Sequence, residues 1–123
     1  MNATRVFTPA PIKPIITPDV LESIDIRVGT IERVEDVAKS NKLVKLIVNF
    51  GDHTRCILAG IRKERVDPQE IAGKQALFVV NLAPKTMAGE SSEGMMFDIG
   101  CADGLLPVMA VPEKPIPNGA RAG

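Results

Sequence analysis

Residues 41–61 read NKLVKLIVNFGDHTRCILAGI, and this stretch decides the fold. The apolar residues of its first half alternate along the chain and fall on one side of an extended strand: Val44, Leu46, Val48 and Phe50. Such a period of two is typical of a half-buried strand. Residues 51–53 form a turn sequence, and residues 54–59 are rich in residues that favour strands. The stretch therefore predicts a β-hairpin with a short loop.

The basic residues of this hairpin lie at or beyond the strand ends and on the less apolar side. They are Lys42, Lys45, Arg55, Arg62 and Lys63. We interpret them as a basic rim on a small sheet. Each lysine that meets a phosphate makes the affinity for nucleic acid more dependent on salt. The alternative is that these are ordinary solvated side chains.

Composition limits the classes of protein to which the chain can belong. A chain of 123 residues and 13.2 kDa has room for one domain with one hydrophobic core. The formal net charge is +0, so no overall positive field attracts polyanions. Any contact with nucleic acid must therefore come from a local patch of basic residues.

The sequence carries no pattern that indicates an enzyme, a metal site or a cofactor. Cys56 and Cys101 have no metal-binding spacing, and His53 is the one histidine. Neither a Cys nor a Ser stands beside His53 in a nucleophile pattern, and no Walker or Rossmann motif is found. Prolines interrupt the N-terminal segment, and no apolar run approaches the length of a membrane span. We expect a non-catalytic protein without cofactors, in the reducing cytoplasm.

Other local signals predict elements on both sides of the hairpin. Residues 83–94 are polar and contain glycine, which predicts an irregular loop, and its length makes it a candidate site that includes Lys85. Gly29 predicts a bulge or a sharp bend in the first strand. The predicted elements are an extended arm at 1–18, a helical turn at 19–23, strands at 24–34, 74–82, 95–99 and 106–111, a short capped helix at 68–72 and a turn at 101–105.

About five short strands with one small helix before the fourth are the outline of an OB-fold barrel. The predicted fold class is therefore all-β. We divide the chain into a proline-rich arm at 1–18, an OB-fold domain at 19–104 and a C-terminal extension at 105–123. The fold alone does not establish a function.

Five short motifs follow one another in the chain: DIRVG at 25–29, KLVKL at 42–46, LAGI at 58–61, VNL at 80–82 with PK at 84–85, and SEGM at 92–95. With the closing PNGAR at 117–121, they resemble the tRNA-binding domain family. That family includes the C-terminal module of many bacterial methionyl-tRNA synthetases, free-standing structure-specific tRNA-binding proteins and the CsaA chaperones. The resemblance covers roughly residues 24–120.

The resemblance implies an OB-fold homodimer in which about residues 105–120 help to form the interface. It also implies recognition of the shape of tRNA, chiefly its elbow and outside corner. The contacts that it implies by position are Lys42 or Lys45, Lys85, and Ser92 with Met95. A glutamine is common in the family where this chain has Glu93, and a negative charge in a loop that faces phosphate weakens contact with tRNA.

Two features of the candidate loop allow more than one interpretation. Ser92 can meet phosphate or ribose, and Met95 can lie against a base or sugar. Alternatively, Met95 belongs to the core. The chain has no Trp or Tyr and only four Phe, which disfavours general binding of single strands by stacking and favours recognition of a folded RNA.

The sequence therefore favours a non-catalytic, homodimeric tRNA-binding protein. The alternative is a CsaA-like, export-related chaperone that binds unfolded polypeptides in the dimer groove and apolar loops. A third interpretation is a subunit that works with an aminoacyl-tRNA synthetase, for which the proline-rich arm would be the tether. No interpretation involves a membrane.

Overall fold

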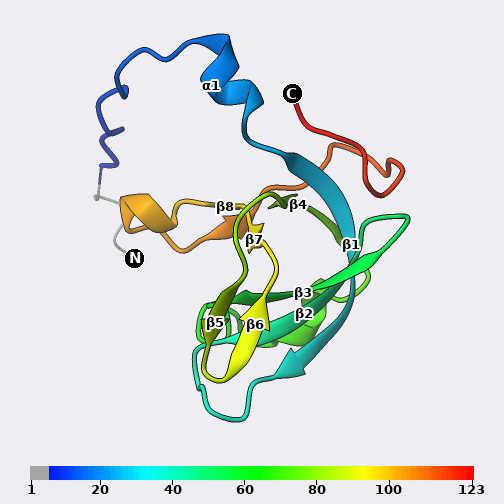
Figure 1. Cartoon of the computed structure of the whole chain (residues 1–123). Helices are drawn as coiled ribbons and strands as arrows, with labels where there is room; N and C mark the ends of the chain where they lie inside the picture. Colours follow the sequence, from blue (N-terminus) through cyan, green and yellow to red (C-terminus); the bar gives the residue numbers. More distant parts are fainter. Residues whose placement is uncertain (1–5) are drawn as a thin grey trace.

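A computed structural model describes residues 6–123, so residues 1–5 of the predicted arm lie outside the described residues. Five antiparallel strands form one strongly curled sheet (Figure 1). They are β1 (Ile26–Asp36), β2 (Val44–Asn49), β3 (Thr54–Ala59), β4 (Gln75–Val79) and β7 (Met95–Met96), in the order β3-β2-β1-β4-β7. This arrangement confirms the predicted all-β OB-fold.

The β2–β3 hairpin has the predicted strands and turn. Its register runs from Val44 opposite Ala59 to Asn49 opposite Thr54. The turn is closed by the backbone N–H of Phe50, which donates to the carbonyl of His53 at 2.9 Å. Burial alternates along β2, because every second side chain enters the barrel.

β1 bends so that its two halves pair with different strands. Residues 26–30 pair with β4, and residues 30–36 pair with β2. The bulge lies between Ile31 and Arg33, so it begins two residues after Gly29, where a bulge or a sharp bend was predicted. Gly29 allows a close approach instead, because a Cβ atom there would lie 2.5 Å from Val48 Cγ1.

The core fills the inside of the curled sheet. Its largest fully buried side chains are Phe78, Ile31, Leu46, Ile57, Ile71, Val44 and Val48. Phe78 on β4 and Phe50 pack in a T-shaped pair, with ring centroids 5.6 Å apart and planes at 86°, as aromatic pairs prefer. One contiguous core is therefore shared by all five strands of the sheet and the segment before β4.

Both predicted helices are present as short turns. α1 (Pro18–Glu22) buries none of its residues. η1 (Pro68–Ile71) is a single 3₁₀ turn, capped by the Asp67 carboxylate, which accepts from the N–H of Gln69 at 3.0 Å. Ile71 of η1 is fully buried, so this turn closes one side of the barrel.

The prediction of an irregular loop at 83–94 is wrong. β5 (Lys85–Met87) and β6 (Glu90–Ser92) form a tight hairpin there. Ala88 and Gly89 connect them, with φ angles of 49° and 81°. Two-residue hairpins of type I′ need positive φ at both positions, where Asn, Asp and Gly are the common residues. Ala88 lacks this signal, which is why the turn was missed.

The strand predicted at 95–99 is divided. Its first part is β7, and its second part, β8 (Asp98–Ile99), pairs with β9 (Val108–Met109). η2 (Cys101–Asp103) lies between β8 and β9, where a turn was predicted. The strand predicted at 106–111 is thus reduced to two residues.

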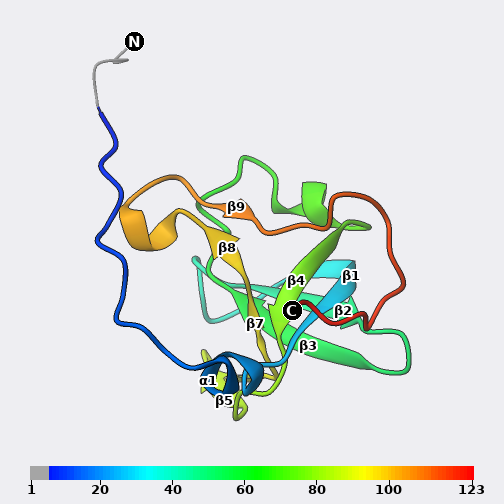
Figure 2. The same cartoon turned by 90° about the horizontal axis from the view of Figure 1, so that it is seen from above.

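The last residues of the chain lie along the edge of β1 (Figure 2). The N–H of Gly119 donates to the carbonyl of Val28 at 2.8 Å, and the N–H of Val28 donates to the carbonyl of Ala120 at 3.0 Å. Residues 6–17, by contrast, form an extended arm that stands away from the barrel in both views. Among the described residues there is no helix with the length and apolar character needed to span a membrane.

Candidate nucleic-acid interface

Two loops meet at one end of the barrel. Residues 37–43 connect β1 to β2, and the β5–β6 hairpin lies beside them in Figure 1. A Cβ atom on Gly89 at the hairpin tip would lie 3.9 Å from Lys39 Nζ. We call this region the basic end and define it by Lys39, Lys42, Lys45, Arg62, Lys63 and Lys85.

Two neighbouring side chains accept hydrogen bonds from the backbone of β3 and so attach the hairpin to it. Leu58 N–H donates to Ser92 Oγ at 3.0 Å, and Cys56 N–H donates to Glu93 Oε1 at 3.0 Å. The backbone N–H of Glu93 donates to the carbonyl of Cys56 at 2.8 Å. The Glu93 carboxylate, which the sequence placed in a loop facing phosphate, therefore helps to close the barrel.

Lys45 on β2 is held by acidic residues. Its Nζ lies 2.8 Å from Glu90 Oε1 and 3.9 Å from Glu35 Oε1. The hydrogen bond to Glu90 raises the pKa of the Lys45 ammonium above its usual value. The lysine is charged, but the nearby carboxylates compensate its field.

Arg62 is also paired. Its Nη1 lies 2.5 Å from Asp36 Oδ1 at the end of β1. Its backbone N–H donates to the carbonyl of Lys42 at 3.1 Å, which fixes the segment after β3 against the 37–43 loop. Arg62 thus contributes to the order of the basic end, while its charge is partly offset.

Lys42, Lys63 and Lys85 are exposed, and within residues 6–123 none of them makes an ion pair. The stem of Lys42 passes over Gly60, where a Cβ atom would lie 3.4 Å from Lys42 Cε. Lys85 begins β5 opposite Ser92. Lys39 is also exposed and makes no ion pair in the described chain, so these four ammonium groups can meet phosphates without first leaving a carboxylate.

Arg55 lies away from the other predicted basic residues. It is opposite Val48 in the β2–β3 register, and cross-strand partners share one face of a sheet. Since Val48 is fully buried, that face points into the barrel. The Arg55 guanidinium reaches the far rim, where Nη1 donates to the carbonyls of Val80 at 2.6 Å and Glu93 at 3.1 Å.

Ser92 and Met95 differ in their environments. Ser92 is 4% exposed, and its hydroxyl donates to the carbonyl of Gly94 at 3.1 Å while it accepts from Leu58. Met95 is 48% exposed and Met96 is buried. Alternate residues of β7 therefore face solvent and core, as in any half-buried strand.

Lys39 is the one member of the basic end that sequence reasoning missed. It stands in the polar connection before β2, and its chain position gives no sign of what it faces. Its neighbour is the tip of the β5–β6 hairpin, which was not predicted. Recognition of the Ala88-Gly89 turn would have been the signal that could identify it.

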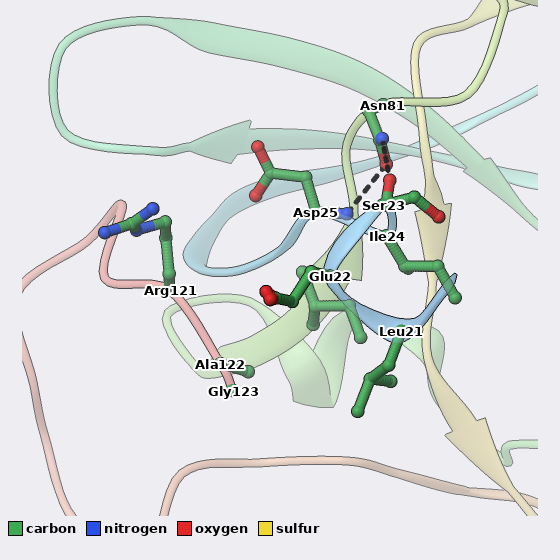
Figure 3. Close-up of a pocket in the computed structure, with 10 residues that line it drawn as sticks. Leu21, Glu22, Ser23, Ile24, Asp25, Asn81, Arg121, Ala122 and Gly123 are labelled. Atoms are coloured by element: carbon green, nitrogen blue, oxygen red, sulfur yellow. Dashed lines mark hydrogen bonds between the residues drawn. The ribbon is translucent and has the colours of Figure 1, made fainter. Parts of the chain in front are cut away.

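A pocket of about 840 Å³ lies elsewhere (Figure 3). It is bounded by α1, the start of β1 and the last residues of the chain, with Leu21 and Ile24 on one side and Arg121 on another. Asn81 braces its wall: its Oδ1 accepts from the N–H of Asp25 at 2.9 Å, and its Nδ2 donates to the carbonyl of Ser23 at 2.7 Å. The residues described in the structure include no cluster of side chains that could hold a metal.

Comparison of the sequence with known proteins finds a matching family profile and relatives that share one description. A family profile described as "Putative tRNA binding domain" matches residues 26–121. The methionine–tRNA ligase of Chlorobium chlorochromatii (strain CaD3) is 47% identical over 94 residues, which cover 76% of this chain and 13% of the relative. The ligase of Methanocaldococcus jannaschii is 39% identical over 101 residues, which cover 82% of this chain and 15% of the relative. The chain thus spans about one seventh of these relatives.

Solved structures are similar over most of the chain. A MetRS related protein from Pyrococcus horikoshii has a TM-score of 0.82 and 33% identity, covering 90% of this chain and 100% of that one. The chaperone CsaA from Bacillus anthracis str. Ames has a TM-score of 0.76 and 26% identity, covering 89% of this chain and 100% of that one. The matching profile, the sequence relatives and the barrel together show that this chain belongs to the tRNA-binding domain family.

Proposed function

We propose that the protein is a non-catalytic, homodimeric tRNA-binding protein that recognises the shape of tRNA through its basic end. The observation that carries this proposal is the group of four exposed lysines, without ion pairs in the described chain, around two adjoining loops of a tRNA-binding domain. The chain is neutral overall, so the position of these charges must supply the attraction.

The eight residues proposed from the sequence have different roles in this proposal. Lys42, Lys63 and Lys85 contact phosphates directly, as does Lys39, which was not among the eight. Lys45 and Arg62 contribute after they exchange a carboxylate for a phosphate, and Met95 offers an apolar contact. Arg55 and Ser92 hold the hairpin and the barrel rim in place, since their polar atoms already bond to the protein.

The affinity for tRNA tests this function through its dependence on salt. Phosphate contacts from the four unpaired lysines of each protomer predict that log K falls with log salt with a slope of roughly −3.6 per protomer. Filter binding or fluorescence anisotropy between about 50 and 200 mM salt measures this slope. Binding that stays constant over this range would contradict the electrostatic interface.

A chaperone of the CsaA type is the second candidate function. The structural similarity to CsaA from Bacillus anthracis and the pocket beside the exposed side chains of Leu21 and Ile24 favour it. Capture of an unfolded polypeptide by apolar contacts is nearly indifferent to salt. The same titration with a reduced, unfolded protein as the ligand therefore distinguishes the two functions.

We propose that a second copy of this chain covers the apolar side chains of the C-terminal extension. Five of them are at least 44% exposed: Leu105, Leu106, Val108, Val111 and Ile116. Several exposed apolar side chains within twelve residues favour an interaction site. A dimer would also present two basic ends to one large folded RNA.

Substitution of Leu106, which is 74% exposed, tests the dimer. We expect Leu106→Asp to shift the protein towards the monomer, because the interface would have to bury an unpaired carboxylate. Light scattering after size exclusion measures the mass. Val66→Asp is the matched control, since Val66 is fully exposed in the loop after β3. A wild-type mass of one chain, or a dimer that Leu106→Asp leaves intact, would contradict this interface.

The relatives named methionine–tRNA ligase are enzymes, and the match covers only the part of them that corresponds to this domain. We propose that the domain contributes RNA binding and no chemistry, alone or as an accessory to an aminoacyl-tRNA synthetase. The two thiols, Cys56 and Cys101, are both free, which supports action in the reducing cytoplasm.

A further inference from the structure

A smaller pocket lies at the opposite end of the barrel from the basic end. It has a volume of about 250 Å³ and is formed by the start of β1, the β2–β3 turn and the residues after β4. Its lining residues are Asp25, Arg27, Phe50, Asp52, His53, Arg55, Val80 and Asn81. None of the functions described above uses this pocket.

Its aromatic wall is a fixed imidazole ring. His53 stacks on Phe50, with ring centroids 5.6 Å apart and planes at 26°. Phe50 is buried, so it supports one face of the imidazole, and the His53 side chain is still 46% exposed. The ring therefore presents aromatic surface to solvent from a rigid base.

Both ring nitrogens of His53 are held by neighbours. Arg55 Nε donates to His53 Nε2 at 3.1 Å, so Nε2 is the acceptor and Nδ1 carries the proton. Nδ1 then donates to Asp52 Oδ1 at 2.6 Å. This bond lowers the pKa of the Asp52 carboxyl. The two bonds fix the plane of the ring.

The other wall places donors beside acceptors. Arg27 Nε and Nη2 donate to the two carboxylate oxygens of Asp25 at 2.8 and 3.0 Å. Asp25 is itself fixed, because its N–H donates to Asn81 Oδ1 at 2.9 Å. A guanidinium and a carboxylate held side by side match the mixed donor and acceptor edge of a nucleobase.

We propose that this pocket binds one unpaired nucleobase of the bound RNA, stacked on His53, with its edge towards Arg27 and Asp25. The inference rests on the proposed tRNA-binding function and adds a second contact to it. A free phosphate suits the pocket poorly, because Asp25 and Asp52 face it as well as the two arginines. The volume is below the range of drug-sized sites, which suits a single base.

Three variants test the platform by tRNA affinity. We expect His53→Ala to weaken binding roughly tenfold, because stacking of one base is lost. His53→Phe retains a flat ring on Phe50 without the hydrogen bonds, so we expect it to bind within about twofold of the wild type. Thr54→Ala is the control, since Thr54 is an exposed neighbour that does not line the pocket. Thermal melting confirms that each variant is folded.

A second measurement uses the unmodified protein and does not depend on the variants. We expect titration with 5′-AMP or 5′-CMP to shift the backbone amide NMR signals of Arg27, His53 and Asn81. The amide signal of Lys63 should stay unchanged. If the nucleotides leave the signals of the pocket residues unchanged, the inference is overturned. It is also overturned if an unfolded peptide shifts these signals and the nucleotides do not.

The outcomes separate the inference from the proposed function. Wild-type protein that binds tRNA while His53→Ala binds equally well overturns the base pocket and leaves the tRNA-binding function standing. If His53→Phe and His53→Ala lose the same affinity for tRNA, the hydrogen bonds of His53 matter and stacking does not. This result also overturns the base pocket. Wild-type protein that binds no tRNA refutes the proposed function, and the nucleotide titration then decides the pocket alone.

Discussion

Combined Lys42→Glu and Lys85→Glu substitution should lower the affinity for tRNA roughly 100-fold at low salt. Each replacement removes one phosphate contact and also places a carboxylate against a phosphate, where like charges repel. Both lysines are exposed and free of ion pairs within the described chain, so no internal carboxylate is left unpaired. Anisotropy titration with labelled tRNA measures the loss, and the salt slope should become shallower by about two.

The matched control makes the same change in net charge at two positions outside the basic end. Lys13 in the arm and Lys74 before β4 are also exposed lysines outside the basic end. Lys13→Glu with Lys74→Glu should therefore weaken binding several-fold less than the first pair, through the overall field alone. Equal losses in both double variants, or full affinity in Lys42→Glu with Lys85→Glu, would show that the basic end is not the tRNA interface. Capture of unfolded polypeptide should be unchanged in both.

The second large effect concerns stability. Phe78→Ala should lower the free energy of unfolding by about 3–5 kcal/mol, because a fully buried aromatic side chain leaves a cavity. Phe78 is 0% exposed, and its ring packs against that of Phe50 in a T-shaped pair. Urea denaturation monitored by far-ultraviolet circular dichroism measures the change, and a domain of ordinary stability would lose much of its margin.

Phe7→Ala is the corresponding control. It makes the same chemical change in the extended arm, where Phe7 is 48% exposed, so we expect a shift within about 0.5 kcal/mol. A loss at Phe78 no larger than that at Phe7 would mean that the barrel interior is not packed as described.

Local signals in the sequence were sufficient for most of the fold. The alternation in residues 43–50 predicted β2, and the Asp67 cap predicted η1, because both depend on neighbours a few residues away. The β5–β6 hairpin was missed because its first turn residue is Ala88, which seldom adopts positive φ. The propensity of that residue was overridden by the contacts that hold β6 to β3.

The candidate site was less predictable, since charge compensation depends on residues distant in sequence. Nothing near Lys45 indicates that Glu90 will pair with it, and nothing near Arg62 indicates Asp36. The separation of Arg55 from the basic end could have been foreseen, because the alternation along β3 puts it on the same face as Ile57. Its bonds to the carbonyls of Val80 and Glu93 required the three-dimensional structure.

The attachment of the β5–β6 hairpin to β3 through Ser92 and Glu93 has a consequence for divergence among homologues. Because these two adjacent side chains hold the end of β6 to β3, residues can be inserted or deleted at the tip of the β5–β6 hairpin while the pairing of the main strands stays in register. Natural variants can thereby lengthen or shorten the projecting loop and change how far it extends over an RNA, without rebuilding the interior.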